Sequence, residues 1–346
     1  MFKVLLSAAL ACAAVFAQSQ RASISGSVTD TQGSSAVGAK VTATNASTNV
    51  AVVTTTNEAG MFLIPNLEIG TYSVAVEHAG FRRYQETGIA LQTAETFGLN
   101  VKLDLGSVSE TVTVAANAAA LEDKTSVITQ TFEPEQVADL PLGDRRTMNL
   151  VSLAAGAVFV DYTTGGKPNF SLAGGRTQSQ MVWLDGGSTQ NMRLGAGQLD
   201  TDPPAESIQE VKILSSTYAA EYGASAGGVV IQTTKSGTNS FRGSAYEFLR
   251  NDTFDAPGFF APILNGVKTI PKLRYNVYGI TLGGPVRRNK TFFFFSYEGR
   301  NLRVGSTTTL TVPTLAQRKG DFSQTVTAAG SMIQIFDPST NLDSCL

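Results

Sequence analysis

Catalysis by this chain would have to centre on Gly223-x-Ser225-x-Gly227, a spacing that in hydrolases exposes a nucleophilic serine on a tight turn. Such a serine needs a histidine that follows it in the chain. The single histidine, His78, lies far upstream, and a lone histidine is also a poor metal site. We therefore predict no enzymatic activity, no metal and no cofactor, and we interpret the small residues as a close-packed strand.

The composition favours many short strands and turns, since 33 of the 346 residues are glycine and only 16% are charged. The formal net charge is −2, and no long basic run occurs. Because nucleic-acid binding needs a concentrated positive surface, we expect no nucleic-acid partner.

Residues 1–17 are predicted to be a secretory signal peptide. Lys3 supplies a positive charge, and the apolar run 4–15 is too short to cross a bilayer as a helix. Cleavage is expected after Ala17, with lipidation at Cys12 as the alternative. Cleavage would leave Cys345 as the only cysteine, so no intramolecular disulfide is expected.

Residues 22–104 alternate between apolar and polar side chains, which predicts half-buried strands in two sheets packed face to face. The alternating runs are Ile24, Gly26 and Val28; Val37, Ala39, Val41 and Ala43; Tyr72, Val74 and Val76; and Phe97, Leu99, Val101, Leu103 and Leu105. His78 shares the parity of the third run, so we expect it at the edge of the core.

The glycine and apolar spacing of this segment resembles the carboxypeptidase regulatory-like domain, a transthyretin-like β-sandwich. The resemblance is carried by Gly26–Asp30, Val37–Val41, Asn57–Phe62, Gly70–Tyr72 and Ala79–Phe81. It implies no catalysis, because a zinc carboxypeptidase needs two histidine ligands and a carboxylate, whereas this chain has one histidine.

Residues 119–237 carry four motifs whose order resembles the plug domain of TonB-dependent receptors, an α+β domain. The motifs are Gly174-Gly175-Arg176, Leu184-Asp185-Gly186, Ile208-Gln209-Glu210-Val211 and the run from Tyr222 to Gly237. Helices are expected at 134–140 and 146–154. The chain departs from the family at Gln209, where a negative residue is more usual, and in the glycine-poor stretch 199–207. We expect these departures to affect loops more than the framework.

The resemblance implies a plug framework whose members are Gly175, Arg176, Asp185, Gly186, Glu210, Tyr222, Gly223, Gly227, Gly228 and Lys235. In a plug, the charged members would face the polar interior of a barrel and hold the plug by hydrogen bonds and ion pairs. Simple surface exposure is the alternative, and the spacing does not decide between the two.

Residues 107–118 are expected to link the sandwich to the plug. Within them, Glu110, Thr111, Val112, Thr113 and Val114 resemble a TonB box, the extended segment that TonB of the inner-membrane energising complex captures. An exposed strand can be captured by edge pairing, in which backbone bonds give grip and alternate side chains give selectivity. The alternative is that these residues form only the last strand of the sandwich, or a linker.

Residues 240–346 are predicted to begin an outer-membrane β-barrel. Runs at 241–250, 274–283 and 291–299 alternate and have the length of tilted membrane strands, with Tyr278, Ile280 and Leu282 facing one way. The connection at 251–273 is long, and the turn at 284–290 is short and charged. Outer-membrane barrels have this alternation of long outer loops and short periplasmic turns. The run Phe292–Phe295 alone would also fit a buried soluble strand. The pieces Pro313-Thr314, Arg318–Ser323 and Phe336–Pro338 resemble the next outer loop of Oar-like receptors, a group that also carries the N-terminal sandwich.

The predicted fold is therefore mainly β: a transthyretin-like β-sandwich, an α+β plug, and the first few antiparallel strands of an incomplete, truncated barrel. The resemblance implies the N-terminal part of a TonB-dependent transporter for energised uptake of an unidentified extracellular ligand. TonB, outer-membrane lipid and that ligand are the implied partners, and the sandwich is expected in the periplasm. The alternative is a non-transporting periplasmic or cell-surface binding module built on the sandwich.

Overall fold

The structure is a computed structural model of the chain. It describes residues 21–106, 111–115, 128–140, 142, 144–162, 168–177, 179–189, 202–218, 222–223, 225–259, 261, 263–264, 266–305, 312–327 and 329–333. The predicted signal peptide 1–17, Glu110 of the candidate TonB box, and Cys345 lie outside the described residues. Two compact units are present, residues 1–248 with 277–300, and residues 249–276 with 301–346.

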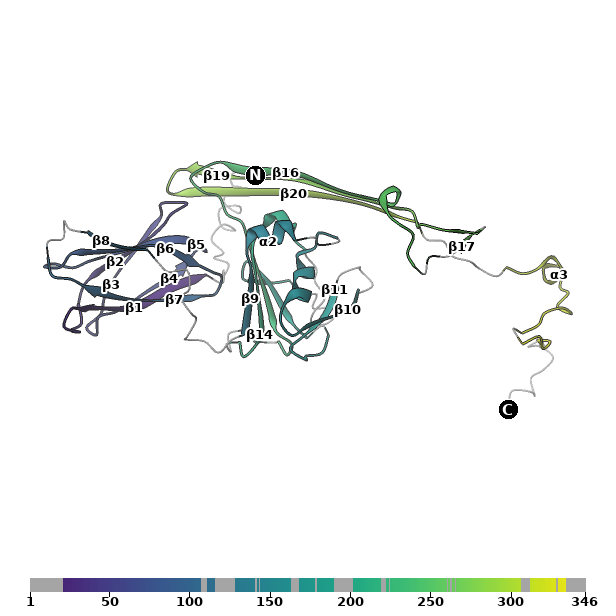
Figure 1. The fold of residues 1–346 in the computed structure, drawn as a ribbon, viewed down its shortest axis with the longest axis horizontal. Coiled ribbons are helices and arrows are strands. Elements are labelled where there is room, and N and C mark those ends of the chain that lie inside the picture. Colours follow the sequence, from purple (N-terminus) through teal and green to yellow (C-terminus); the bar gives the residue numbers. More distant parts are fainter. Residues whose placement is uncertain are drawn as a thin grey trace, which may run out of the picture. The chain divides into compact units, whose positions relative to one another are not determined.

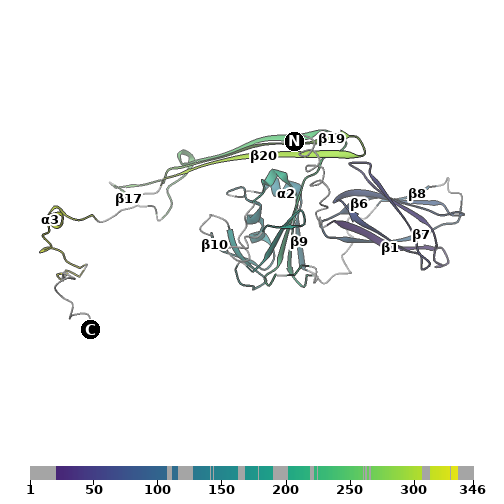
Figure 2. The same cartoon turned by 180° about the vertical axis from the view of Figure 1, so that it is seen from behind.

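The segment from Ala22 to Ala115 folds as a β-sandwich (Figures 1 and 2). One sheet has the order β4 (Met61–Leu67), β1 (Ala22–Asp30), β7 (Thr96–Leu103). The other has the order β3 (Ala51–Thr55), β2 (Lys40–Asn45), β5 (Gly70–Glu77), β6 (Arg83–Leu91), β8 (Thr111–Ala115). Their inner faces enclose one apolar cluster that includes Ile24, Val41, Val74, Ile89 and Leu103. The predicted alternation therefore positions this core.

Two ends of the predicted alternating runs are wrong. Val37 is exposed in a turn, because Gly38 has φ +75° and the strand begins only at Lys40. Leu105 is exposed because β7 ends at Leu103. His78 follows the last residue of β5, and its Nε2 lies 3.1 Å from the carbonyl oxygen of Val37, at the edge of the sandwich.

The second region is built on a five-stranded sheet with an apolar layer on one face. The strand order is β13 (Gly187–Ser188), β12 (Met181–Leu184), β15 (Val229–Thr234), β14 (Ile208–Ser216), β9 (Ile128–Phe132). The other elements are α2 (Pro134–Asp139), the 3₁₀ helices η1 (Thr147–Leu153) and η2 (Ala205–Ser207), and the hairpin of β10 (Ala157–Tyr162) and β11 (Pro168–Leu172). Val137, Leu150, Phe170 and Ile213 lie in the core between sheet and helices.

Both predicted helices of this region exist, but the second has a different form. Residues 134–140 give α2, whose N-cap Glu133 forms a capping box with Gln136. Residues 146–154 give the 3₁₀ helix η1, closed by a 3.0 Å bond from the Ala154 amide to the Val151 carbonyl. A short run that contains the β-branched residues Thr147 and Val151 suits this tighter helix better than an α-helix.

The third region is a three-stranded sheet with the order β16 (Arg242–Asn251), β19 (Leu273–Arg287), β20 (Thr291–Val304) (Figure 1). Tyr278, Ile280 and Leu282 are exposed, while Val277 and Thr281, which have the opposite parity, are buried, as the alternation predicts. The predicted turn 284–290 is too long, because β19 continues through Pro285 to Arg287. The sheet therefore has one exposed apolar face.

The remaining described elements are short. They are η3 (Asp252–Phe254), the hairpin of β17 (Ile263–Leu264) and β18 (Val267–Lys268), and α3 (Leu315–Arg318). Asn251 caps η3 by accepting a 3.0 Å bond from the Thr253 amide. No helix in the described part of the chain combines the length and apolar character needed to cross a membrane.

Candidate functional site

The candidate TonB box lies mostly on β8, at one end of a sandwich sheet. β8 pairs in parallel with β6, with Thr111 opposite Arg83 and Ala115 opposite Thr87. Among the strands that the structure describes, β8 has a neighbour on one side only. Val112 is half-buried, whereas Thr113 and Val114 are exposed. The described part of the segment is therefore an edge strand of the sandwich, which is the arrangement of the structural alternative, and its capture by TonB stays a proposal.

The Gly-Gly-Arg motif forms a tight turn packed against the later glycine run. Gly174 has φ +75°, and a Cβ on Gly175 would lie 2.7 Å from the Gly227 Cα. Gly228 has φ +88°, with the Leu214 carbonyl oxygen 2.9 Å from the position of a Cβ. Close backbone approach and left-handed conformation both require glycine at these positions. Four motif glycines expected from the sequence thus lie in one place.

The Leu-Asp-Gly motif forms the β12–β13 hairpin and is tied to β15. Asp185 has φ +49° and Gly186 has φ +85°. The Asp185 carboxylate accepts bonds from the Thr234 amide at 2.9 Å and from the Thr234 hydroxyl at 2.8 Å. The Asp185 amide donates to the Gln232 carbonyl at 3.0 Å. The aspartate therefore fixes its own hairpin to the neighbouring strand, and its carboxylate is not directed outward to a partner.

Glu210 and Lys212 are buried on β14 and contact the sandwich. The Glu210 carboxylate accepts bonds from the Thr93 amide at 3.0 and 3.3 Å, and the Lys212 Nζ donates to the Thr93 carbonyl at 3.0 Å. Burial raises the pKa of Glu210, while the Thr93 bond and the Lys212 charge oppose that shift. A framework glutamate expected to face a barrel interior or solvent thus binds the β6–β7 turn of the sandwich.

The other framework residues differ in burial. Tyr222 is buried with Leu214 and Ile231 on the second face of the sheet. Gly223 is exposed and has open space around it. Arg176 is exposed, and its carbonyl accepts bonds from Ser179. The Lys235 amide donates to the Ser207 carbonyl at 2.8 Å, and its side chain is half-buried. Of the four charged framework residues, Arg176 best fits simple exposure.

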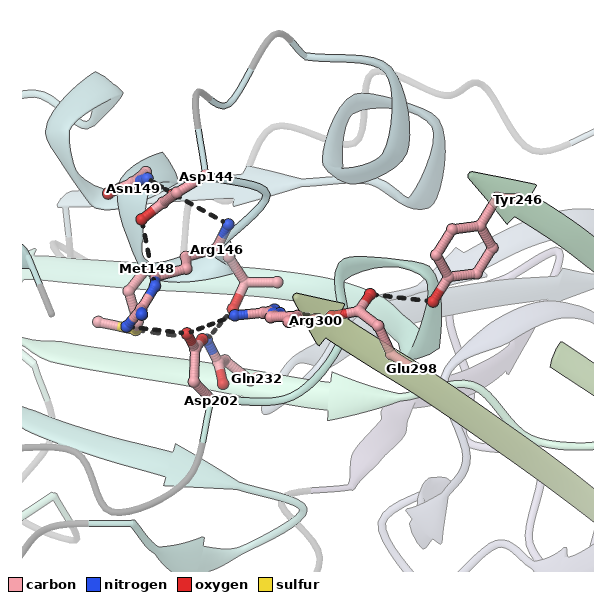
Figure 3. Close-up of polar contacts among 10 residues, drawn as sticks. Asp144, Arg146, Met148, Asn149, Asp202, Gln232, Tyr246, Glu298 and Arg300 are labelled. Carbon is pink, nitrogen blue, oxygen red and sulfur yellow. Dashed lines mark hydrogen bonds and ion pairs between the residues drawn. The ribbon is translucent and has the colours of Figure 1, made fainter. Parts of the chain in front are cut away.

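An ion-pair chain joins the second region to β20, as Figure 3 shows. The Asp202 carboxylate lies 3.6 Å from the Arg146 Nη1 and 3.6 Å from the Arg300 Nη1. Arg146 also pairs with Asp144 at 3.1 Å, and Arg300 pairs with Glu298 at 2.6 Å. The Glu298 carboxylate accepts a 3.0 Å bond from the Tyr246 hydroxyl. Charges of opposite sign therefore alternate from the 144–146 segment to strand β20.

A second contact to the third sheet centres on Arg145. Its guanidinium donates to the Ala138 carbonyl at 2.7 Å, pairs with Glu206 at 3.1 Å, and lies 3.8 Å from the centre of the Phe248 ring on β16. Arg145 has φ +58°, a conformation that costs roughly 1–3 kcal/mol for a residue with a side chain. Three partners hold the residue in this strained conformation. Arg145 is therefore a fixed cationic contact between the segment before η1 and strand β16.

Sequence reasoning missed these contact residues. Asp202 and Glu206 belong to the stretch 199–207, whose departure from the family we expected to affect loops more than the framework. Here the two acids are the partners of Arg146, Arg300 and Arg145. The sequence offered one signal for these contacts. It contains two adjacent arginines, Arg145-Arg146, and a separate loop around Pro203-Pro204 that carries two acids. That signal does not identify partners so far apart in sequence.

The Gly-x-Ser-x-Gly residues are engaged in backbone packing. The Ser225 hydroxyl contacts the Gly228 carbonyl at 2.5 Å and the Ser179 carbonyl at 3.4 Å. His78 makes its contacts in the sandwich, with the Val37 carbonyl and the Phe81 ring. The serine and the histidine thus have separate sets of partners. The prediction of a close-packed strand is correct for the packing of Gly227 against Ser179, but it is wrong for the strand, which begins only at Val229, and for Gly223, which has open space around it.

Three protein-family models match the chain in sequence order. The Carboxypeptidase regulatory-like domain matches residues 23–104, the TonB-dependent Receptor Plug Domain matches residues 122–230, and the Outer membrane beta barrel domain matches residues 233–344. These matches cover the sandwich, the five-stranded sheet with its helices, and the three-stranded sheet.

The chain is also similar to the TonB-dependent transporter Oar of Myxococcus xanthus. The two are 27% identical over 311 residues, which is 86% of this chain and 28% of the relative's length. Among solved structures, the siderophore receptor PirA from Acinetobacter baumannii is 21% identical, covering 50% of this chain and 24% of that chain, with a TM-score of 0.39. That score is too low to indicate a shared overall fold. The three domain matches in this order and the similarity to Oar identify a plug domain followed by an outer-membrane barrel domain, an arrangement similar to that of TonB-dependent receptors of the outer membrane.

Proposed function

We propose that this chain is the N-terminal part of a transporter that takes up an extracellular ligand across the outer membrane with energy delivered by TonB. In this proposal the region 119–237 is the plug, and the strands β16, β19 and β20 begin the wall that the plug closes. Uptake involves no covalent chemistry on the ligand by this chain. The ligand is unidentified. Outer-membrane lipid contacts the exposed apolar face of the wall strands.

The ion-pair chain through Asp202 is the observation that carries the gating part of the proposal. A plug that must move needs contacts that hold it at rest and can be replaced by water when it moves. The side chains of Arg146 and Arg300 retain 22% and 25% exposure, whereas the Asp202 side chain retains 11% and both of its carboxylate oxygens are buried. When such an ion pair separates, its charged groups can regain bonds to water, whereas an apolar core that opens gains nothing comparable.

The edge position of β8 supports TonB capture in the same proposal. The outer edge of a terminal strand has unpaired backbone N–H and C=O groups, which a strand of TonB can pair with. The exposed Thr113 and Val114 side chains are available for selectivity. Parallel pairing with β6 holds the segment extended before capture.

Binding of the periplasmic domain of TonB to the purified full chain tests this proposal. Deletion of residues 109–116 should abolish binding, because it removes the edge strand. Val52→Pro on β3, the opposite edge of the same sheet, is the matched control and should leave binding intact. Binding that survives the deletion contradicts the assignment of residues 110–114 as the TonB box.

A non-transporting module built on the sandwich remains the second candidate, favoured by the incorporation of β8 into the sandwich sheet. In that case residues 111–115 are structural only. Deletion of 109–116 would then lower the stability of the sandwich while the full chain never binds TonB, with or without the deletion. The same pair of proteins therefore separates the two functions.

A further inference from the structure

We propose that Glu210 and Lys212 form a latch that holds the sandwich on the plug, so that displacement of the sandwich is transmitted to plug strand β14. The role of the latch in uptake rests on the proposed function, whereas the contacts that form the latch are present in this chain whatever its function. It goes beyond capture of a TonB box, because it assigns a mechanical partner to the sandwich.

The latch grips both polar groups of a single residue. Glu210 accepts the Thr93 N–H at 3.0 Å, and Lys212 donates to the Thr93 carbonyl at 3.0 Å. Residues two apart on a strand project from the same face, so the acid and the base reach the turn together. The Glu210 carboxylate is therefore placed to accept from the backbone N–H of the turn, and the Lys212 ammonium to donate to its backbone C=O.

Burial shows that the site is built around this contact. Glu210 is 7% exposed and Lys212 is 3% exposed, which is unusual for charged residues. Buried charges are tolerated when they are paired and hydrogen-bonded. Here the backbone of Thr93, which is itself buried, supplies a bond to each. Without the sandwich, both charged groups would lose these partners and gain water instead.

Contacts around Thr93 extend the interface. The Thr93 hydroxyl lies 2.8 Å from that of Thr233 on β15, and the Thr131 hydroxyl of β9 donates to Gln92 at 3.1 Å. Ala94, with φ +53°, packs against the apolar cluster on this face of the plug sheet. The turn therefore touches three adjacent strands, and the interface is polar at its centre with an apolar contact beside it.

The position of the turn connects it to the candidate TonB box. Thr93 lies two residues after the end of β6, and β6 is the strand that pairs with β8. A displacement of β8 therefore acts on β6 directly, and from β6 through the turn on β14. This path runs through paired strands and the latch.

Hydrogen exchange of the Thr93 amide in the full chain tests the latch. In the wild type this amide should be protected, and Glu210→Ala should speed its exchange at least roughly tenfold. Glu206→Ala removes a different plug ion pair and is the matched control, expected to leave Thr93 unchanged. Unchanged protection of core amides at Val74 and Ile213 reports that both domains stay folded. Equal Thr93 exchange in wild type and Glu210→Ala would overturn the proposal.

Transmission is tested by pulling single molecules between cysteines at Thr113→Cys on β8 and Arg176→Cys on the plug, with Cys12 and Cys345 replaced by serine. Rupture of the latch should give an event before either domain unfolds. That event should disappear in Glu210→Ala and persist in Glu206→Ala. Its persistence in Glu210→Ala would overturn the latch. TonB is absent from both experiments. Their results therefore test the latch separately from the proposed binding of TonB.

Discussion

The sandwich core and the boundary of the plug are held by opposite chemistry. Inside the sandwich, one apolar cluster joins two sheets, and Ile24, Val41, Val74 and Ile64 have no exposed surface. At the plug boundary, the contacts to strands β16 and β20 are ion pairs and a cation–ring contact. Under the proposed function, the apolar core would keep the sandwich intact under load, and the polar contacts would be the ones that open.

Removal of a core side chain from the sandwich should have the largest effect. Ile64→Ala leaves a cavity in a fully buried site and is expected to lower the free energy of unfolding by about 2–5 kcal/mol. Leu63→Ala, at the exposed neighbouring position on β4, should change it by no more than about 0.5 kcal/mol. Hydrogen exchange of the Val74 amide measures both, and equal losses would contradict the assigned faces of β4.

The close glycine contact of the plug should come next. Gly175→Ala places a methyl group 2.7 Å from the Gly227 Cα, and overpacking of this kind costs about 1–3 kcal/mol. Gly223→Ala adds the same methyl group in open space with an ordinary φ, so it is the matched control. Urea unfolding followed by Trp183 fluorescence reports on the plug sheet. A Gly175→Ala protein as stable as Gly223→Ala would show that the two segments do not approach this closely.

The ion-pair chain should contribute less. Asp202→Asn removes the negative charge between Arg146 and Arg300, and because the carboxylate is buried while both arginines are partly exposed, we expect a loss of roughly 1–2 kcal/mol. The loss should shrink in high salt, where charge interactions are screened. Glu68→Gln, in the exposed pair with Arg21, should cost under about 0.5 kcal/mol. An Asp202→Asn effect that is independent of salt would argue for packing instead of charge.

The same contrast explains what could be predicted from the sequence. Alternation placed Val41, Val74 and Leu103 inside the sandwich, because period two follows from strand geometry alone. It failed at Val37, where the left-handed Gly38 delays the start of β2. Turn motifs indicated the glycine contacts of the plug because close approach restricts the residue type. The local rules of strand alternation and turn conformation were thus sufficient to predict most of the fold.

The hydrogen-bond and ion-pair partners of the charged residues could not be predicted by any local rule. Glu210 was placed on a strand, but its partner Thr93 is 117 residues away in the chain. Asp202 lies in a loop whose departure from the family motif appeared unimportant to the framework, yet two arginines converge on it. Partner choice depends on how separate sheets meet, and that information is not contained in spacing or parity.

The smallest predicted effect concerns the charge of Glu210. Burial raises the pKa of this carboxyl, Glu95 adds to the rise, and the Thr93 N–H and Lys212 oppose it. Because the folded-state pKa lies above the ordinary value of 4.5, the folded plug binds this proton more readily than the unfolded chain does. Its contribution to stability is thus complete below pH 4.5 and declines as the pH rises through the folded-state pKa. Glu210→Gln removes this slope, whereas Glu135→Gln on the exposed side of α2 keeps it. Trp183-monitored unfolding from pH 4 to 7 measures the difference, and a wild-type stability that rises relative to Glu210→Gln over this range would contradict the buried environment of Glu210.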